Sequence, residues 1–152
     1  MFREVTVWDI RPLPAAVPGV TFVQADATNL DGIPDASVES LSSLHAIEHF
    51  GLGRYGDPLD PLACDKAMRS FARVLAPGGR LLLALPVSRS RVEFNGQRVL
   101  DPAHVVETCR PLELAEFCVI DDQRSFHTRA DPFAYRDQRG ACGMFEFVKP
   151  SP

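Results

Sequence analysis

The stretch RVLAPGGRLLLALP, residues 73–86, joins the end of a helix to a strand. Apolar residues lead into it at roughly helical spacing, at Leu62, Met68, Phe71 and Ala72, and the spacing continues to Leu75 within it. Pro77-Gly78-Gly79 predicts the end of that helix, because proline lacks an amide donor and glycine favours helix ends. The nearly continuous apolar run from Arg80 to Pro86 is typical of a strand that is covered on both faces.

Three further strands are expected upstream, at residues 4–9, 20–24 and 38–44. Asp9 ends the first, and Asp26 follows the second. Asp60 is expected to cap the helix that leads into residue 73. Strands that alternate with helices or long crossings, and that end in acids, indicate an open α/β sheet with ligand groups at its carboxyl edge.

The chain after residue 86 is less regular. Residues 91–94 and 97–100 flank Asn95-Gly96, which predicts a β-hairpin with a two-residue turn. Such an insert at the carboxyl edge of the sheet would stand beside the site as a lid or substrate wall. Further elements are expected as helices from Asp101-Pro102 to about Cys109 and over 111–116, and as strands over 117–121 and 144–148. We see no repeat or linker, so residues 1–152 are expected to form one domain.

Two short motifs overlap in HAIEHFGLGRYGD, residues 45–57. His45 to His49 matches H-x-x-E-H, a zinc-protease pattern, but it follows a strand candidate directly and reaches Gly51 at once. We therefore expect no metal site. Residues 51–56 match G-x-G-x-x-G, but no helix begins directly after them and Asp57 would repel a phosphate. A dinucleotide loop is therefore not expected either.

Composition and charge exclude several classes of protein. The chain has 45% hydrophobic and 24% charged residues, which suits a soluble domain with a core. No apolar run approaches membrane-spanning length and no signal peptide is recognised, so we expect a cytoplasmic protein with no membrane partner. The net charge of −4 is concentrated in residues 1–61, with nine acids and three bases, so nucleic acid is an unlikely partner. Four cysteines without motif spacing are expected to be reduced and mostly buried.

Taken in order, these features resemble the class I S-adenosylmethionine-dependent methyltransferases, from their second strand onward. The most specific piece is R-V-L-x-P-G-G-x-L at 73–81, and the L-x-x-x-E-H ending at residue 49 is also typical. More narrowly, LSSLHAIEHFGLGRYGDPLDP at 41–61 is similar to a methyltransferase-like family of unknown function. The resemblance covers about residues 4–122 and implies a Rossmann-like methyltransferase fold.

The resemblance also implies roles for particular residues. Asp9 would hold the ribose hydroxyls of S-adenosylmethionine, since a carboxylate accepts two hydroxyl protons. Asp26 would cap the adenine amine, with a backbone amide from Ala27. Ser43 and Leu44 would edge the methyl donor, and His45 or His49 would serve as the base. Candidate substrate-binding residues are Arg54, Tyr55, Asn95 and Arg98.

One departure from the family concerns the start of the fold. The family's first strand and its glycine-rich loop, which wraps the methionine moiety, have no counterpart before Glu4. We therefore expect weak binding of S-adenosylmethionine. We also expect the Val5–Trp8 strand to pair directly with the Val38–Ser43 strand, or a homodimer to cover the open edge.

Two functions follow as hypotheses. The first is methyl transfer to an unknown substrate, with a small-molecule or saccharide-type acceptor left open. The second is a non-catalytic, methyltransferase-like binding or regulatory module, because fold alone does not settle function.

Overall fold

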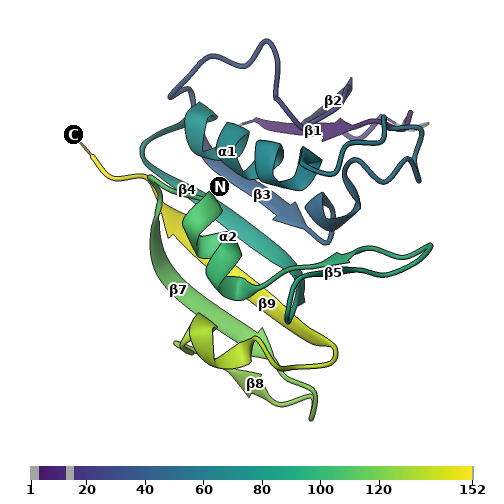
Figure 1. Cartoon of the computed structure of the whole chain (residues 1–152). Coiled ribbons are helices and arrows are strands. Elements are labelled where there is room, and N and C mark those ends of the chain that lie inside the picture. The colour runs from purple at the N-terminus through teal and green to yellow at the C-terminus, as the bar shows by residue number, and fades with distance from the viewer. Residues whose placement is uncertain (1–3, 13–15, 152) are drawn as a thin grey trace.

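The computed structural model describes residues 4–12 and 16–151 (Figure 1). In these residues the strands are β1 (Val5–Asp9), β2 (Val20–Gln24), β3 (Val38–Leu44), β4 (Leu75–Val87), β5 (Arg91–Val92), β6 (Arg98–Val99), β7 (Glu113–Ile120), β8 (Phe126–His127) and β9 (Ala141–Val148). The helices are η1 (Ile47–His49), α1 (Ala63–Val74), α2 (Pro102–Thr108) and η2 (Pro132–Tyr135), where η marks a 3₁₀-helix. The chain is a mixed α/β protein.

The main sheet has five strands in the order β3-β4-β9-β7-β8. β3 and β4 are parallel, and β9 then runs antiparallel to both β4 and β7. α1 and α2 lie on one face of this sheet (Figure 1). Because β3 and β4 are parallel, their carboxyl ends meet at one edge, where η1 begins.

β1 and β2 form a separate parallel pair, in register from Val5 with Val20 to Asp9 with Gln24. The expected direct pairing of the Val5–Trp8 and Val38–Ser43 strands is therefore wrong for the part of the chain that the structure describes. There, the outer edge of β3 and one edge of β1 have no strand partner. Trp8 nevertheless packs against the core of the main sheet, which holds the pair in place. A dimer that covers these edges stays a prediction.

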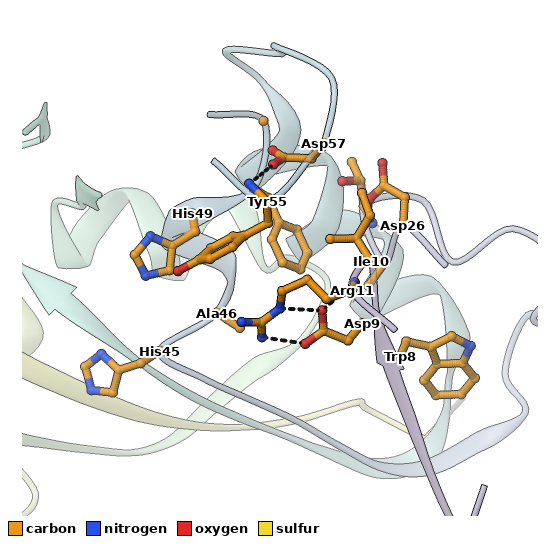
Figure 2. Close-up of a pocket in the computed structure, with 14 residues that line it drawn as sticks. Trp8, Asp9, Ile10, Arg11, Asp26, His45, Ala46, His49, Tyr55 and Asp57 are labelled. Atoms are coloured by element: carbon orange, nitrogen blue, oxygen red, sulfur yellow. Dashed lines mark hydrogen bonds and ion pairs between the residues drawn. The ribbon is translucent and has the colours of Figure 1, made fainter. Parts of the chain in front are cut away.

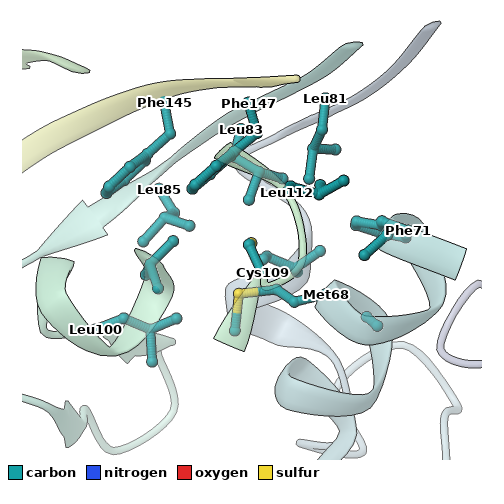
Figure 3. Close-up of a cluster of buried hydrophobic side chains, with 14 of the residues drawn as sticks. Met68, Phe71, Leu81, Leu83, Leu85, Leu100, Cys109, Leu112, Phe145 and Phe147 are labelled. Atoms are coloured by element: carbon teal, nitrogen blue, oxygen red, sulfur yellow. The ribbon is translucent and has the colours of Figure 1, made fainter. Parts of the chain in front are cut away.

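The core lies between the main sheet and the two helices (Figure 3). β4 contributes alternate residues, and both α1 and α2 pack against them, as expected for helices with one apolar face. These buried side chains include Leu81, Leu83 and Leu85 of β4, Phe145 and Phe147 of β9, Met68 and Phe71 of α1, and Val105 of α2. Cys64 and Cys109 are buried among them, and burial raises the pKa of each thiol to about 12.

The opposite face of the sheet is only partly covered. Leu82 is 41% exposed and Ile120 is 40% exposed, although their strand neighbours are buried. The expectation that residues 80–86 are covered on both faces is therefore wrong. An apolar run could not reveal this, because Leu82 is as hydrophobic as the leucines on either side of it.

The expected break at Pro77-Gly78-Gly79 lies inside β4. α1 ends earlier, at Val74, and β4 begins at Leu75. Between β3 and β4 the register shifts from Val38–Leu75 to Ser40–Arg80. Four residues of β4, 76–79, therefore bulge out opposite the single residue Glu39 of β3. Gly78 has φ +75°, a conformation that glycine adopts without strain. The glycines therefore shape the strand entry instead of ending the helix.

Residues 111–116 were expected to be helical, and this is wrong. Most of them belong to β7, which pairs with β9 from Glu113–Val148 to Ile120–Cys142. A register shift between Leu114 and Glu116 interrupts the alternation that would have indicated a strand. Cross-strand pairing outweighs local helix propensity here.

Candidate functional site

A cavity of about 160 Å³ lies where the carboxyl ends of β1 and β3 approach each other (Figure 2). Its walls come from the exits of β1, β2 and β3, from η1 and from the loop at 51–57. The residues that line it are Trp8, Asp9, Ile10, Arg11, Asp26, Ala27, Thr28, His45, Ala46, His49, Phe50, Gly51, Tyr55 and Asp57. Six of the eleven predicted site residues are among them.

Asp9 is held by its neighbour Arg11. The Arg11 amide and Nε donate to Oδ1 at 2.8 and 3.0 Å, and Nη2 donates to Oδ2 at 2.7 Å. This guanidinium keeps the pKa of the Asp9 carboxyl below its usual range. Arg11 also lies over the Tyr55 ring at 4.8 Å, a cation–π contact. The carboxylate is thus charged but already paired, a feature that sequence reasoning missed.

Asp26 and Ala27 follow β2 and line the same cavity. The Asp26 Oδ1 accepts the Thr28 amide at 2.8 Å, so this carboxylate fixes its own loop. Asp26 is exposed, and its Oδ2 has no hydrogen-bond partner among the described residues. The geometry fits both loop capping and recognition of an amine.

The glycine loop of this chain, residues 51–57, folds around the side chain of Asp57. The carboxylate of Asp57 accepts the amides of Gly53 at 3.2 Å and Tyr55 at 3.1 Å. Burial alone would raise the pKa of Asp57, but the amide hydrogen bonds outweigh it, and the pKa is lowered. The amides that a phosphate would need are thus bound to an internal anion. This geometry does not favour a phosphate loop.

The predicted substrate-binding residues connect the loop to the β5–β6 hairpin. Arg54 donates through Nη1 to the carbonyls of Asn95 and Gly96 at 3.0 and 3.1 Å. Arg98 is only 6% exposed, and it donates to the carbonyls of Phe50 and of Asp60. Both arginines thus hold backbone in place. A direct role in substrate binding stays a prediction for them.

The hairpin itself differs in detail from the expected one. β5 and β6 pair at Arg91–Val99 and Val92–Arg98, and the Glu93 amide donates to the Gln97 carbonyl at 2.9 Å. The turn therefore has three residues, 94–96, instead of two. Asn95 adopts φ +51°, as asparagine does in such turns.

Ser43 and Leu44, expected at the methyl donor, lie outside the cavity lining. Ser43 is buried, and its hydroxyl is without a hydrogen-bond partner among the described residues. Leu44 is 62% exposed on the open face of the sheet. Neither side chain lines the cavity, whose wall from this segment begins at His45.

The two histidines of HAIEH occupy different environments. His49, in η1, packs edge-on to Tyr55 with ring centroids 5.7 Å apart (Figure 2). His45 precedes η1 with φ +52°, and its Nδ1 lies 3.2 Å from Oε1 of the fully buried Glu48. On the other side, Nε2 of His45 lies 3.4 Å from Sγ of Cys142. Sequence reasoning missed Cys142, which is 97 residues away and joins His45 only through the β4–β9 pairing.

Among the described residues, no group of three or more histidine, cysteine or acidic side chains could hold a metal ion. None of the described helices is both long and apolar enough to cross a membrane.

A model of a family described as Caenorhabditis protein of unknown function, DUF268, matches residues 34–118. The chain belongs to the DUF268 family. The match runs from the entry of β3 into β7, and it includes both histidines, the glycine loop and the segment 73–81. No curated protein matches the chain.

Solved structures show which fold this DUF268 chain has. It is similar to the [4+2]-cyclase SpnF, with 20% identity and a TM-score of 0.60, over 88% of this chain and 58% of the cyclase. It is also similar to the N-methyltransferase NodS of Bradyrhizobium japonicum with S-adenosylhomocysteine. The identity is 13% and the TM-score 0.58, over 97% of this chain and 67% of NodS. A third similar structure is the 1,6-didemethyltoxoflavin-N1-methyltransferase of Burkholderia thailandensis with bound 1,6-didemethyltoxoflavin and S-adenosylhomocysteine. The identity is 15% and the TM-score 0.62, over 97% of this chain and 62% of the enzyme.

These likenesses establish a methyltransferase-like, Rossmann-like fold over nearly the whole chain. They do not establish its chemistry, because a cyclase stands beside methyltransferases among the matches. The chain spans 58% of the cyclase and 62% of the toxoflavin enzyme, so each of those proteins has substantial further structure.

Proposed function

We propose that this DUF268 chain is an S-adenosylmethionine-dependent methyltransferase domain that holds the adenosine half of the cofactor at Asp9 and Asp26. The cavity at the carboxyl ends of β1 and β3 carries the proposal, because it joins both strand-end acids to two histidines and Tyr55. Ligands of open α/β sheets bind at this edge. Two structurally similar methyltransferases were solved with S-adenosylhomocysteine.

The residues present fit the adenosine half better than the methionine half. Asp9 and Asp26 supply carboxylates for hydroxyls and an amine, and Trp8 and Ile10 supply apolar wall. The charged ends of methionine need fixed donors and acceptors, and the cationic lining residue Arg11 is already paired with Asp9. When bound, the cofactor supplies an electrophilic methyl group. His49 or His45 would accept the proton of the attacking substrate atom.

Weak binding is the expected consequence. Each charge-assisted hydrogen bond is worth about 1.5–3 kcal/mol, so the loss of two would weaken binding roughly a hundredfold or more. Calorimetry with S-adenosylhomocysteine, adenosine and methionine separates the two halves. We expect weak binding of S-adenosylhomocysteine, similar binding of adenosine, and no binding of methionine.

Matched variants test the assignment. Asp26→Asn and Asp9→Asn should each weaken adenosine binding, whereas Asp31→Asn should not, since Asp31 is exposed and outside the cavity lining. Micromolar binding of S-adenosylhomocysteine that Asp9→Asn and Asp26→Asn leave unchanged would contradict the proposed site.

A non-catalytic binding module is the second candidate, and Arg11 favours it. Its guanidinium covers both oxygens of the carboxylate that the ribose would need. Absence of binding for all three ligands, in the wild type and in Arg11→Ala, would support the module over the enzyme.

A further inference from the structure

A thiol, an imidazole and a carboxylate form a chain of contacts at the edge of the main sheet. Sγ of Cys142 lies 3.4 Å from Nε2 of His45, and Nδ1 of His45 lies 3.2 Å from Oε1 of Glu48. The three residues come from β9, the exit of β3 and η1. A nucleophile next to a base, with the base oriented by a third group, is the arrangement that activates nucleophiles.

Glu48 is buried, and His45 is its one side-chain partner among the described residues. Glu48 is 0% exposed, and its Oε2 has no hydrogen-bond partner among the described residues. A buried carboxylate is costly unless it is paired, and His45 is the partner that the described chain supplies. The carboxylate favours the tautomer with its proton on Nδ1, which leaves Nε2 free to accept a proton from the thiol.

His45 is held between these groups by a strained backbone. Its φ of +52° is uncommon for a residue other than glycine, and its amide donates to the carbonyl of Ala84 at 2.8 Å. Strain of this kind persists only where the surroundings fix it, and it is concentrated at functional sites. Here it places the ring between Glu48 and Cys142.

The thiol faces a second cavity, of about 200 Å³, distinct from the one with Asp9 and Asp26. His45 and Cys142 line it, together with Arg91, Glu93 and Arg139. Arg91 is paired with Glu93 at 2.8 Å, whereas the guanidinium of Arg139 has no ion pair among the described residues. The cavity therefore has room for a small molecule and a surplus positive charge.

We propose that Cys142 is a nucleophile toward small anionic electrophiles, with His45 as its proton acceptor and Glu48 as the positioning residue. Sγ forms a bond to the electrophilic carbon, and the S–H proton passes to Nε2 of His45. The leaving group departs with the electron pair of the bond that breaks. Arg139 attracts the anionic part of the substrate. This activity requires no nucleotide. It shares only His45 with the proposed methyl transfer, because His45 lines both cavities.

Burial and the charge of Glu48 raise the pKa of the Cys142 thiol. The thiol is therefore neutral at rest, and attack depends on removal of its proton by His45. In this respect the group works as a serine–histidine–acid triad does, where the nucleophile is also neutral before attack.

Alkylation by iodoacetate and by iodoacetamide tests the proposal, with peptide mass spectrometry to count the label at each cysteine. Cys118 is the internal control, because it is also half-buried but contacts Glu116 instead of a histidine. We expect Cys142 to react about tenfold or more faster than Cys118 with iodoacetate. The iodoacetate-to-iodoacetamide rate ratio should be higher at Cys142, and Arg139→Ala should lower it.

His45→Gly and Glu48→Gln test the base and its positioning residue. Glycine tolerates φ +52° and leaves a space where the imidazole ring was. His45→Gly should therefore slow the alkylation of Cys142 to the rate at Cys118 or below, and added imidazole should restore the Cys142 rate. Glu48→Gln should also slow Cys142. A merely loosened fold would have the opposite effect, since it would expose every cysteine, including Cys64, and raise its alkylation rate.

Equal rates at Cys142 and Cys118 in the wild type would overturn the proposal. So would a Cys142 rate that His45→Gly leaves unchanged, or an imidazole effect of the same size at Cys118.

Discussion

The Asp9–Arg11 pair is the residue-scale feature that bears most directly on ligand binding. Because Arg11 occupies both carboxylate oxygens, a ribose must displace it. We predict that Arg11→Ala strengthens adenosine binding roughly two- to fivefold, the range expected from an exposed ion pair. Calorimetry measures the change, with Arg54→Ala as the control, since Arg54 contacts Tyr55 but not Asp9. Equal or weaker adenosine binding by Arg11→Ala would show that Arg11 helps to form the site.

Gly51 is required at the start of the loop for two reasons. Its φ is +71°, and a Cβ there would lie 2.1 Å from the Asp60 carbonyl oxygen and 2.6 Å from Cβ of Ala63. We predict that Gly51→Ala lowers the free energy of unfolding by about 2–4 kcal/mol. Gly56→Ala should cost only about 1 kcal/mol, because Gly56 shares the positive φ but faces open space. Denaturant titration compares them, and equal losses would show that the clash relaxes.

The histidines of HAIEH lead to a prediction about metal content. His45 contacts Glu48 and His49 packs on Tyr55, so the two rings serve different partners. We predict that protein purified without metal-affinity resin carries no stoichiometric zinc. Elemental analysis measures this, and one zinc per chain that is lost in His45→Ala would contradict it.

At the scale of elements, Arg98 joins the β5–β6 hairpin to the loop that walls the cavity. Its buried guanidinium donates to the carbonyls of Phe50 and Asp60. We predict that Arg98→Ala costs about 2–4 kcal/mol of unfolding free energy, since two half-buried carbonyls lose a charged donor.

The control is Arg54→Ala, which removes an exposed contact to the hairpin tip and should cost less than about 0.5 kcal/mol. Limited proteolysis should cleave the 51–57 loop faster in Arg98→Ala than in Arg54→Ala. Equal cleavage would mean that other contacts hold the loop.

At the scale of the whole molecule, the two sheets should differ in stability. β1 and β2 pair only with each other among the described strands, whereas β4 and β9 lie inside a five-stranded sheet over the core. A two-stranded unit is marginal by itself, so it opens at lower free energy than the core. We predict faster amide exchange in Val5–Asp9 and Val20–Gln24 than in Leu75–Val87, measured by mass spectrometry.

If β1 and β2 exchange as slowly as β4, an additional partner must cover their edge. Sedimentation at several concentrations would then show whether that partner is a second copy of the chain.

The sequence by itself determined the local elements that have strong local causes. Val20–Gln24 and Val38–Leu44 are strands as expected, and α2 begins at Pro102 with Asp101 as its cap, because the Asp101 side chain accepts the Ala103 amide at 3.0 Å. The family resemblance also gave the methyltransferase-like fold, since the segment 73–81 joins the end of α1 to the start of β4 in one contiguous pattern.

Only the tertiary structure decided what depends on distant partners. β7 is a strand because β9 pairs with it, and Leu82 is exposed because the described elements cover that face only in part. Cys142 meets His45 because β9 lies beside β4, and Arg98 is buried because two loop carbonyls need its charge. The physical reason is the same in each case: burial and pairing are set by residues far apart in sequence, so no local pattern contains them.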